Sequence, residues 1–357
     1  MTAQKTPVPT PVLEAVGVTR HFDVSGVLGR TQVVRAVENA DLTLHRGEIV
    51  ALVGESGSGK TTLARLLALF HPVTDGEIRL EGTVVRPGTK AAKAYHSSVQ
   101  MIFQDPFGSL NSMRRVRHNI ERALRLHGHA AASKAERRQQ VLELLERVNL
   151  TPAEHFIDKL PHELSGGQRQ RVVIARALAV RPSVLLGDEP ISMLDVSIRL
   201  DMLNLLARLR DEDGLSLLYI THDIAGARYL ADRVCVMYAG QLVESGPTEE
   251  VIQHPKHPYT RLLLESSPDP ERLMNPELGS AFDRTASPGE PPSLVSPPPG
   301  CRFHPRCPSA RDECRRAFPG RTEFPSGQWT HCWLHGSGGN PLTPPSDTDD
   351  HQADRRR

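Results

Sequence analysis

The sequence of 357 residues has no long apolar segment. No stretch reaches the roughly 18–20 apolar residues that a membrane-spanning helix needs, and the N-terminus lacks an apolar signal segment. The formal net charge is only +1, which argues against nucleic acid as a main partner. We therefore expect a protein that stays in the cytoplasm and that, if it serves a membrane, binds membrane-embedded partners peripherally from the cytoplasmic face.

Proline is scarce in the first part of the chain and abundant afterwards. Only seven of the 29 prolines fall within residues 12–246, whereas nineteen come later. This distribution, with apolar runs that alternate with helical patterns, predicts an α/β domain over 12–250 and an extended, loop-rich region over 251–335 that forms no second large α/β core. Polar tails are predicted at 1–11 and at 336–357, the latter disordered.

A glycine-rich segment lies between an apolar strand and a helical pattern. Ile49–Val53 forms the apolar run, and the residues from Gly54 to Thr61 then fit the P-loop pattern. The glycines let backbone N–H groups point inward and form an anion-binding nest at a helix N-terminus. Lys60 adds a charge for the β- and γ-phosphates of ATP, and the Thr61 hydroxyl is placed to ligate Mg²⁺. The predicted nucleotide-binding residues here are Gly54, Glu55, Ser56, Gly57, Ser58, Gly59, Lys60, Thr61 and Thr62.

A second apolar strand ends in two carboxylates. Residues 184–187 are followed by Asp188 and Glu189, and ligands of open α/β sheets sit at the carboxyl ends of the strands. We expect Asp188 to hold Mg²⁺ and Glu189 to orient or polarise the water that attacks ATP.

The segment Leu164–Gln168 opens a strongly helical stretch. Ser165, Gly166, Gly167 and Gln168 place two glycines where bare N–H groups can meet an anion. Leu-Ser-Gly-Gly-Gln followed by Arg-Gln-Arg resembles the signature motif of the ATP-binding cassette ATPases. The resemblance implies a P-loop cassette that pairs head to tail with a second one, so that the signature residues contact the ATP held by the partner.

The other motifs of that family occur in the family's order. By resemblance, Gln104 senses Mg²⁺ and the γ-phosphate, Asp195 is the aspartate at the dimer interface, and His222 contacts the γ-phosphate. Phe22 is the aromatic expected to stack on adenine, with a core position as the alternative. The predicted catalytic set is Glu189, His222 and Gln104, with Gln104 also beside Mg²⁺.

Residues 104–180 are mostly helical in pattern. One helix has a readable start, because Ser133 and Glu136 are spaced as a capping box. The family places its helical subdomain here, and residues 107–111 resemble the loop that receives the coupling helices of transmembrane subunits. The resemblance implies as partners two transmembrane permease subunits, a second cassette ATPase, identical or paralogous, and an extracytoplasmic solute-binding protein.

The C-terminal part of the sequence indicates a particular subfamily of these ATPases. Pro255–Leu263 resembles the C-terminal tag of oligopeptide/dipeptide importer ATPases, and that subfamily also carries the cysteine pattern that follows. Four of the five cysteines lie within 32 residues, at Cys301, Cys307, Cys314 and Cys332. Such clustering in a cytoplasmic protein favours a metal or cluster site over disulfides, and the irregular spacing fits a [4Fe–4S] cluster better than a zinc ribbon. Zinc and free or regulatory thiols remain alternatives, and His304, His331 or His335 could replace a ligand.

The sequence is therefore interpreted as the ATP-hydrolysing subunit of a membrane importer of the oligopeptide/dipeptide type. A soluble translation ATPase of this class usually joins two cassettes, but only one P-loop occurs here. A chromosome-organising ATPase would carry a long coiled coil between Lys60 and Ser165, where no heptads are sustained. The cargo stays open among peptides, nickel chelates and sugars.

Overall fold

The computed structural model describes residues 10–25, 31–192, 194–266 and 289–336. The tails predicted at 1–11 and 336–357 lie outside this part of the chain, apart from residues 10, 11 and 336. Among the described residues, none of the helices combines the length and the apolar character needed to cross a bilayer.

A central sheet positions the site. Its eight strands lie in the order β11–β12–β10–β9–β3–β8–β7–β6. The strands from β9 to β6 are parallel, and β10, β12 and β11 continue the sheet antiparallel. Their bounds are β3 (Ile49–Val53), β6 (Val99–Ile102), β7 (Val184–Asp188), β8 (Ser216–Thr221), β9 (Arg233–Tyr238), β10 (Gln241–Pro247), β11 (Thr322–Glu323) and β12 (Trp329–Thr330). Because β8 alone separates β3 from β7, the glycine-rich loop and the two carboxylates emerge at the same sheet edge.

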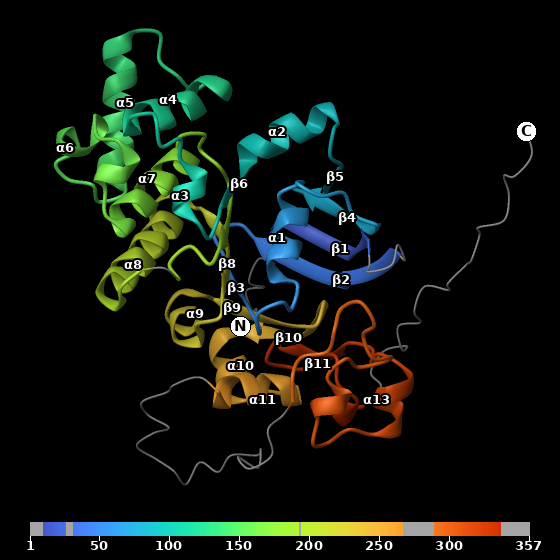
Figure 1. The fold of residues 1–357 in the computed structure, drawn as a ribbon. Helices are drawn as coiled ribbons and strands as arrows, with labels where there is room; N and C mark the ends of the chain where they lie inside the picture. The colour runs from blue at the N-terminus through green and yellow to red at the C-terminus, as the bar shows by residue number, and fades with distance from the viewer. Residues whose placement is uncertain (1–9, 26–30, 193, 267–288, 337–357) are drawn as a thin grey trace, which may run out of the picture.

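A smaller antiparallel sheet lies beside the central one (Figure 1), in the strand order β2–β1–β4–β5. It consists of β1 (Pro11–Ser25), β2 (Thr31–His45), β4 (Asp75–Leu80) and β5 (Thr83–Val85). Helix α1 (Lys60–Leu67) contacts strands of both sheets, β2 of the smaller and β7 of the central one.

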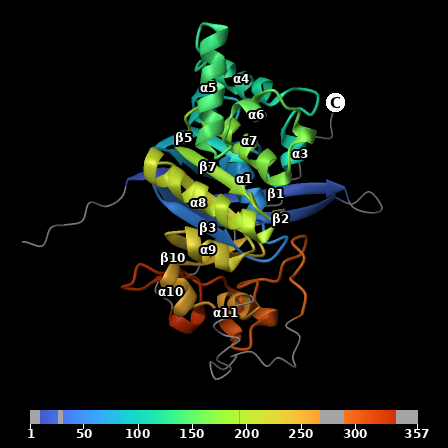
Figure 2. The same ribbon diagram turned by 90° about the vertical axis from the view of Figure 1, so that its left-hand side faces the viewer.

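Helices α3 to α7 form a lobe at the opposite end of the molecule from the C-terminal region (Figures 1 and 2). Within the described ranges, the helices besides α1 are α2 (Lys90–Ser98), α3 (Pro106–Ser109), α4 (Val116–Leu126), α5 (Lys134–Arg147), α6 (Glu154–Ile157), α7 (Gly166–Leu178), α8 (Val196–Asp213), α9 (Ile224–Leu230), α10 (Thr248–Gln253), α11 (Pro258–Glu265) and α13 (Asp312–Arg316), with short 3-10 turns η1 (Pro161–Glu163), η2 (His304–Arg306) and η3 (Trp333–His335). The capping box expected at the start of α5 is present: the Ser133 hydroxyl accepts from the Glu136 N–H at 3.1 Å, and the Glu136 carboxylate accepts from the Ser133 N–H at 3.2 Å.

Two hydrophobic clusters pack on opposite faces of the central sheet. In β3, Ile49, Ala51 and Val53 belong to the cluster that includes the helical lobe, whereas Val50 and Leu52 belong to the cluster with α1 and the smaller sheet. This alternation follows from the two-residue period of a strand. All of β3, β7 and β8 is buried, as in parallel strands covered on both faces.

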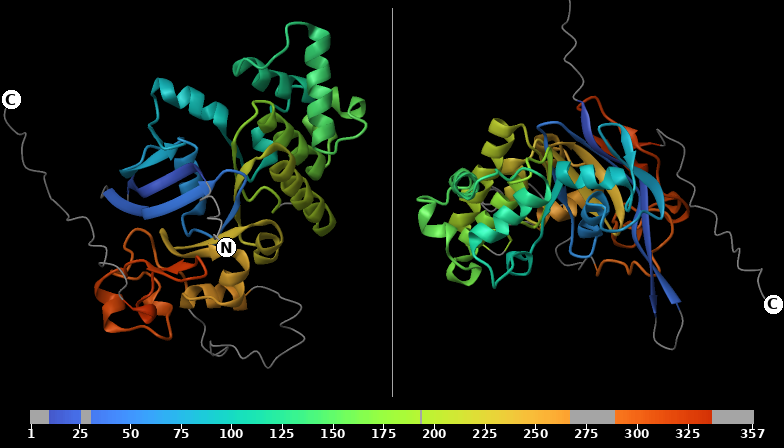
Figure 3. Two further views of the ribbon diagram at one scale, coloured as in Figure 1. Left: turned by 180° about the vertical axis from the view of Figure 1, so that it is seen from behind. Right: turned by 90° about the horizontal axis from the view of Figure 1, so that it is seen from above.

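The C-terminal region lies against the central sheet (Figure 3), to which it adds the strands β11 and β12. Strand β12 pairs with β10, with Glu244 opposite Thr330, and Cys301 and Phe303 belong to the same hydrophobic cluster as Ile49. The C-terminal region therefore contributes both strands and apolar side chains to the core of the central sheet. Loops rich in proline can still place a few apolar side chains in a neighbouring core, as Cys301 and Phe303 do here.

The carboxylate of Glu244 fastens the C-terminal region to the sheet. It accepts hydrogen bonds from the backbone N–H groups of Lys256 at 2.7 Å and His257 at 2.8 Å, and from Nε2 of Gln328 at 2.7 Å. Its side chain is fully buried, and this burial raises the pKa of Glu244, although the hydrogen bonds oppose the shift. A buried carboxylate persists only when it is paired in this way.

Candidate active site

The loop between β3 and α1 requires glycine at two positions. Gly54 has a φ of +154° and Gly59 a φ of +104°. A Cβ at Gly54 would lie 2.2 Å from the carbonyl oxygen of Met237, and one at Gly59 would lie 2.4 Å from that of Ala36. Any larger residue would therefore push the loop away from β9 and β2.

The other predicted residues of the loop follow in a tight turn. Ser56 and Gly57 are exposed at its tip, Ser58 is buried, and Thr62 is half-buried in the first turn of α1. A turn that leads into a helix N-terminus offers backbone N–H groups to an anion. The fold thus places the predicted residues in one continuous turn at the start of α1.

Lys60 begins α1, and its ammonium group points back into the loop. Nζ donates to the carbonyl oxygens of Gly54 at 2.9 Å and Glu55 at 2.8 Å, and it lies 3.4 Å from Oγ of Ser58. Burial lowers the pKa of Lys60, and nearby carboxylates, Glu189 first among them, act in the opposite direction. A cation held over such a nest is suited to the β- and γ-phosphates.

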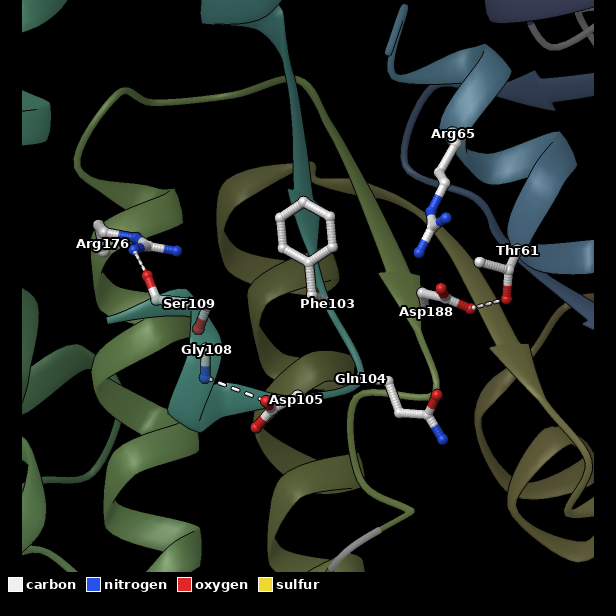
Figure 4. Close-up of a pocket in the computed structure, with 9 residues that line it drawn as sticks. All are labelled: Thr61, Arg65, Phe103, Gln104, Asp105, Gly108, Ser109, Arg176 and Asp188. Carbon is white, nitrogen blue, oxygen red and sulfur yellow. Dashed lines mark hydrogen bonds between the residues drawn. The ribbon is translucent and has the colours of Figure 1, made fainter. Parts of the chain in front are cut away.

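Thr61 and Asp188 meet across the gap between α1 and β7. The Thr61 hydroxyl donates to Oδ1 of Asp188 at 2.9 Å (Figure 4). Burial raises the pKa of Asp188, and the hydrogen bond from Thr61 opposes that shift. Hydroxyl and carboxylate oxygens are ligands that Mg²⁺ prefers, so these side chains fit the predicted magnesium site, whose occupation stays a prediction.

Two of the predicted catalytic residues, Gln104 and His222, contact the carboxylate of the third, Glu189. Gln104 donates from Nε2 to Oε2 of Glu189 at 3.1 Å, and Nδ1 of His222 lies 3.2 Å from Oε1. Gln104 and His222 follow β6 and β8, the strands on either side of β7. Glu189 itself has a φ of +47°, which is unfavourable for a residue with a side chain, and its N–H donates to the carbonyl oxygen of Ile220 at 3.0 Å. Backbone and side chain are both held, as a positioned general base requires.

A cavity of about 640 Å³ opens next to these residues (Figure 4). Its lining residues come from α1, the chain after β6, α3, α7 and β7: Thr61, Arg65, Phe103, Gln104, Asp105, Gly108, Ser109, Arg176 and Asp188. The guanidinium of Arg176 donates to the carbonyl oxygen of Ser109 and so ties α7 to α3. The cavity therefore joins the nucleotide residues to the helical lobe.

The predicted signature residues form the start of α7. Oγ of Ser165 accepts from the Gln168 N–H at 3.3 Å, and Oε1 of Gln168 accepts from the Ser165 N–H at 3.1 Å. Gly166 and Gly167 form the first helical turn, where a Cβ at Gly167 would lie 2.8 Å from Cγ2 of Ile198 in α8. Close packing on α8 thus explains one of the two glycines. The segment belongs to the helical lobe, whereas the P-loop lies between β3 and α1 (Figure 1).

Two further predicted residues lie at the surface of the fold. Asp195 is exposed and immediately precedes α8. Phe22 is half-buried on β1, where its ring packs edge to face on His71 at 5.4 Å and beneath the Arg20 guanidinium at 4.4 Å. Their roles at the dimer interface and against adenine stay predictions.

The four clustered cysteines line one small cavity of about 20 Å³. All are free thiols, and burial raises the pKa of Cys301 to about 12 and that of Cys332 to about 11. In the described ranges, no group of three or more His, Cys, Asp or Glu side chains is arranged to hold a metal ion. The structure therefore places the four predicted thiols around one cavity, but among the described residues it shows no metal site. Cys235 is buried in β9, in line with a core residue.

Two residues outside the predicted motifs contact the P-loop. The Tyr259 hydroxyl accepts from the Glu55 N–H at 2.8 Å, and the Arg306 guanidinium donates twice to the Glu55 carboxylate, at 2.9 and 3.0 Å. Motif spacing could not reveal contacts between residues more than 200 positions apart. The one available signal was the Pro255–Leu263 segment, which contains Tyr259.

Two protein families match successive parts of the chain. Residues 37–192 match the ABC transporter family, and residues 243–314 match the C-terminal region of the oligopeptide/dipeptide transporter family. The first match spans the P-loop, Gln104, the signature and the two carboxylates. The second spans Tyr259, Arg306 and three of the clustered cysteines.

Curated relatives are similar over most of the chain. The dipeptide transport ATP-binding protein DppF of Haemophilus influenzae is 39% identical over 326 residues, which cover 91% of this chain and 97% of that protein. A putative oligopeptide transport ATP-binding protein of Bacillus subtilis, YkfD, is 41% identical over 326 residues, covering 91% and 96%. A putative peptide import ATP-binding protein of Brucella abortus is 46% identical over 293 residues, covering 82% and 84%.

Solved structures match the cassette portion. A dimeric, post-hydrolysis ATP-binding cassette bound to ADP and Pi is 30% identical, with a TM-score of 0.59, covering 66% of this chain and 98% of that one. The cbiO1 protein of Clostridium perfringens, part of an ABC transporter complex, is 26% identical with a TM-score of 0.60, covering 75% and 97%. With the site geometry described above, these similarities show that the chain belongs to the ATP-hydrolysing subunits of ABC transporters, in the oligopeptide/dipeptide transporter family.

Proposed function

We propose that this ATPase powers the import of peptides through a membrane transporter. The observation that carries the catalytic part is the Glu189 carboxylate, held by Gln104 and His222 at the strand edge that bears the P-loop. The names of the curated relatives, and the match to the C-terminal region of the oligopeptide/dipeptide transporter family, support peptides as cargo. Nickel chelates and sugars are the competing cargoes.

We further propose a pair of cassettes bound to two permease subunits on the cytoplasmic face of the membrane, with a solute-binding protein delivering cargo from outside. The location of the signature on the helical lobe, away from the loop between β3 and α1, supports head-to-tail pairing (Figure 1). A similar cassette was solved as a dimer bound to ADP and Pi. Residues 107–111, at and after α3, are the proposed seat of the permease coupling helices.

In this proposal each residue has a defined part in hydrolysis. The P-loop N–H groups and Lys60 hold the β- and γ-phosphates, and Glu189 accepts a proton from the attacking water. Gln104 and His222 keep the Glu189 carboxylate in place. Magnesium, when bound through Thr61, Asp188 and Gln104, would neutralise charge on the phosphates. Ser165–Gln168 of the partner cassette would close over the γ-phosphate.

The clustered cysteines are proposed as ligands of a [4Fe–4S] cluster. Their convergence on one cavity supports a shared ligand, and Cys₄ ligation is the usual form for such clusters. A single zinc ion, with each sulfur at about 2.3 Å from it, is the competing proposal for the same thiols.

The transport function is tested with the complete transporter in lipid vesicles: this chain, the second cassette, two permeases and the solute-binding protein. We expect ATP-dependent accumulation of labelled dipeptides and ATPase activity stimulated by the loaded binding protein. Glu189→Gln should abolish both, whereas Ser133→Ala, a capping residue of α5 away from the site, should retain both. Uptake of nickel chelates or sugars in place of peptides would overturn the cargo, and hydrolysis without any transport would overturn the role in import.

A further inference from the structure

The short segment between Cys301 and Cys307 reaches from the cysteine cavity to the P-loop. Arg306, next to Cys307, makes a bidentate ion pair with Glu55, and its Nη1 also lies 3.2 Å from the Tyr238 hydroxyl. The Arg306 side chain is 7% exposed and that of Glu55 is 28% exposed. A paired, bidentate and largely buried contact fixes the geometry of both groups far better than an exposed salt bridge does.

Tyr259 of α11 holds the same P-loop residue through the backbone. Its hydroxyl accepts the Glu55 N–H at 2.8 Å, and its ring packs on Tyr238 at 4.4 Å and on Phe303 at 5.5 Å. All three rings are fully buried or nearly so. The C-terminal region therefore binds the main chain of Glu55 through Tyr259 and its side chain through Arg306. The surrounding aromatic cluster holds the Tyr259 side chain in place.

The segment is anchored at its other end as well. The guanidinium of Arg302 binds the Glu38 carboxylate and the carbonyl oxygen of Ala239, and Cys301 and Phe303 lie in the main core. A displacement of the 301–307 segment would therefore be transmitted to the P-loop, because Arg306 contacts Glu55 directly and both ends of the segment are packed.

Charge explains why this contact matters for ATP. The P-loop binds a polyanion, yet Glu55 places a carboxylate within it, immediately after Gly54. Without a partner, that carboxylate would repel the phosphates and compete for the Lys60 ammonium, on whose pKa the Glu55 charge already acts. The ion pair offsets the charge of this carboxylate and fixes both of its oxygens on the Arg306 guanidinium.

We propose that Arg306 and Tyr259 are positioning residues for ATP binding, which hold Glu55 so that its carboxylate does not oppose the binding of the phosphates by the P-loop N–H groups and Lys60. The proposal rests on the assignment of residues 54–61 as the phosphate loop. It gives the C-terminal region a direct part in nucleotide affinity, beyond any role in holding a cluster.

The test measures the affinity of the purified full chain for a fluorescent ATP analogue in four proteins: wild type, Arg306→Gln, Glu55→Gln and the double variant. Arg306→Gln should weaken binding about tenfold, within the range of site-to-site coupling, whereas Glu55→Gln alone should change it little. The double variant should bind nearly as well as Glu55→Gln, because the unpaired carboxylate is gone. High salt should shrink the defect of Arg306→Gln, since screening weakens the repulsion.

The matched control is Arg316→Gln, an exposed arginine at the end of α13, which should bind like wild type. Tyr259→Phe removes only the hydroxyl and should weaken binding about threefold, as expected for one lost hydrogen bond, which keeps the test informative if Arg306→Gln fails to fold. Wild-type affinity in both Arg306→Gln and Tyr259→Phe would overturn the proposal, as would a double variant as weak as Arg306→Gln. If Lys60→Ala binds normally, the phosphate-loop assignment fails instead.

Discussion

Nδ1 of His222 lies 3.2 Å from Oε1 of Glu189, although the two residues are 33 positions apart in the chain. They meet because β7 and β8 are adjacent parallel strands, so that the residues following them emerge at one edge. The other carboxylate oxygen of Glu189 receives Nε2 of Gln104 from the chain after β6. A single carboxylate is thus held from both neighbouring strands.

Glu189→Gln tests the role of this carboxylate. The amide keeps the size of the side chain but cannot accept a proton from water, so ATP hydrolysis by the assembled transporter should fall by about 100-fold or more. ATP binding should persist and trap the closed pair of cassettes. Turnover near that of wild type would remove Glu189 from the role of general base.

The local motifs of the site could be predicted from the sequence because each is defined by residues close together in the chain. The P-loop, the Asp188–Glu189 pair and the α5 capping box depend on a strand end or a helix start. Their meeting at one edge depends on the strand order, in which β8 alone separates β3 from β7, and the apolar runs of the sequence do not specify that order.

The contacts of the C-terminal region could not be predicted in this way. The Arg306–Glu55 ion pair joins residues 251 positions apart, and β12 reaches β10 through only two pairs of residues. Neither leaves a periodic pattern, because both depend on tertiary packing. A proline-rich composition describes the local backbone and says little about where single side chains insert.

The pH dependence of ATP binding should reflect Lys60. Burial lowers its pKa in the free protein, whereas bound phosphates favour the charged ammonium. Affinity should therefore be full near neutral pH and fall as the pH rises through the lowered pKa, before the ordinary value of 10.5 is reached. Titration of ATP affinity up to about pH 10 checks this, with Lys60→Arg as the control that stays charged throughout. Constant affinity over that range in the wild type would contradict the prediction.

Ser165→Arg in one cassette of a mixed pair should act on the other cassette's ATP. The change removes the cap of α7 and places a cation at the helix N-terminus, where it is unfavourable. Photolabelling with an azido-ATP, with the two chains separated by size, should show loss of nucleotide trapping at the unmutated chain's P-loop. Ser133→Arg disrupts an equivalent capping box on α5 and is the control, for which both sites should label. Loss confined to the mutant's own P-loop would contradict head-to-tail pairing.

Replacement of Cys301, Cys307, Cys314 and Cys332 by Ser should remove bound iron and also weaken ATP binding. Wild-type protein purified without oxygen should be brown and contain equal amounts of iron and acid-labile sulfide, because a [4Fe–4S] cluster holds four of each. The four-Ser variant should contain neither. Its loss of ATP affinity follows from the anchoring of the 301–307 segment in the core and at Glu55.

Cys235→Ala is the matched control for this experiment, because Cys235 is buried in β9 and does not line the cysteine cavity. It should retain iron, sulfide and ATP affinity. If the wild type contains one equivalent of zinc and no sulfide, the cysteines bind zinc and the cluster proposal is wrong. If it contains neither iron nor zinc, the cysteines are free thiols. Wild-type ATP affinity in a folded four-Ser variant would show that the cysteines do not set the position of Arg306.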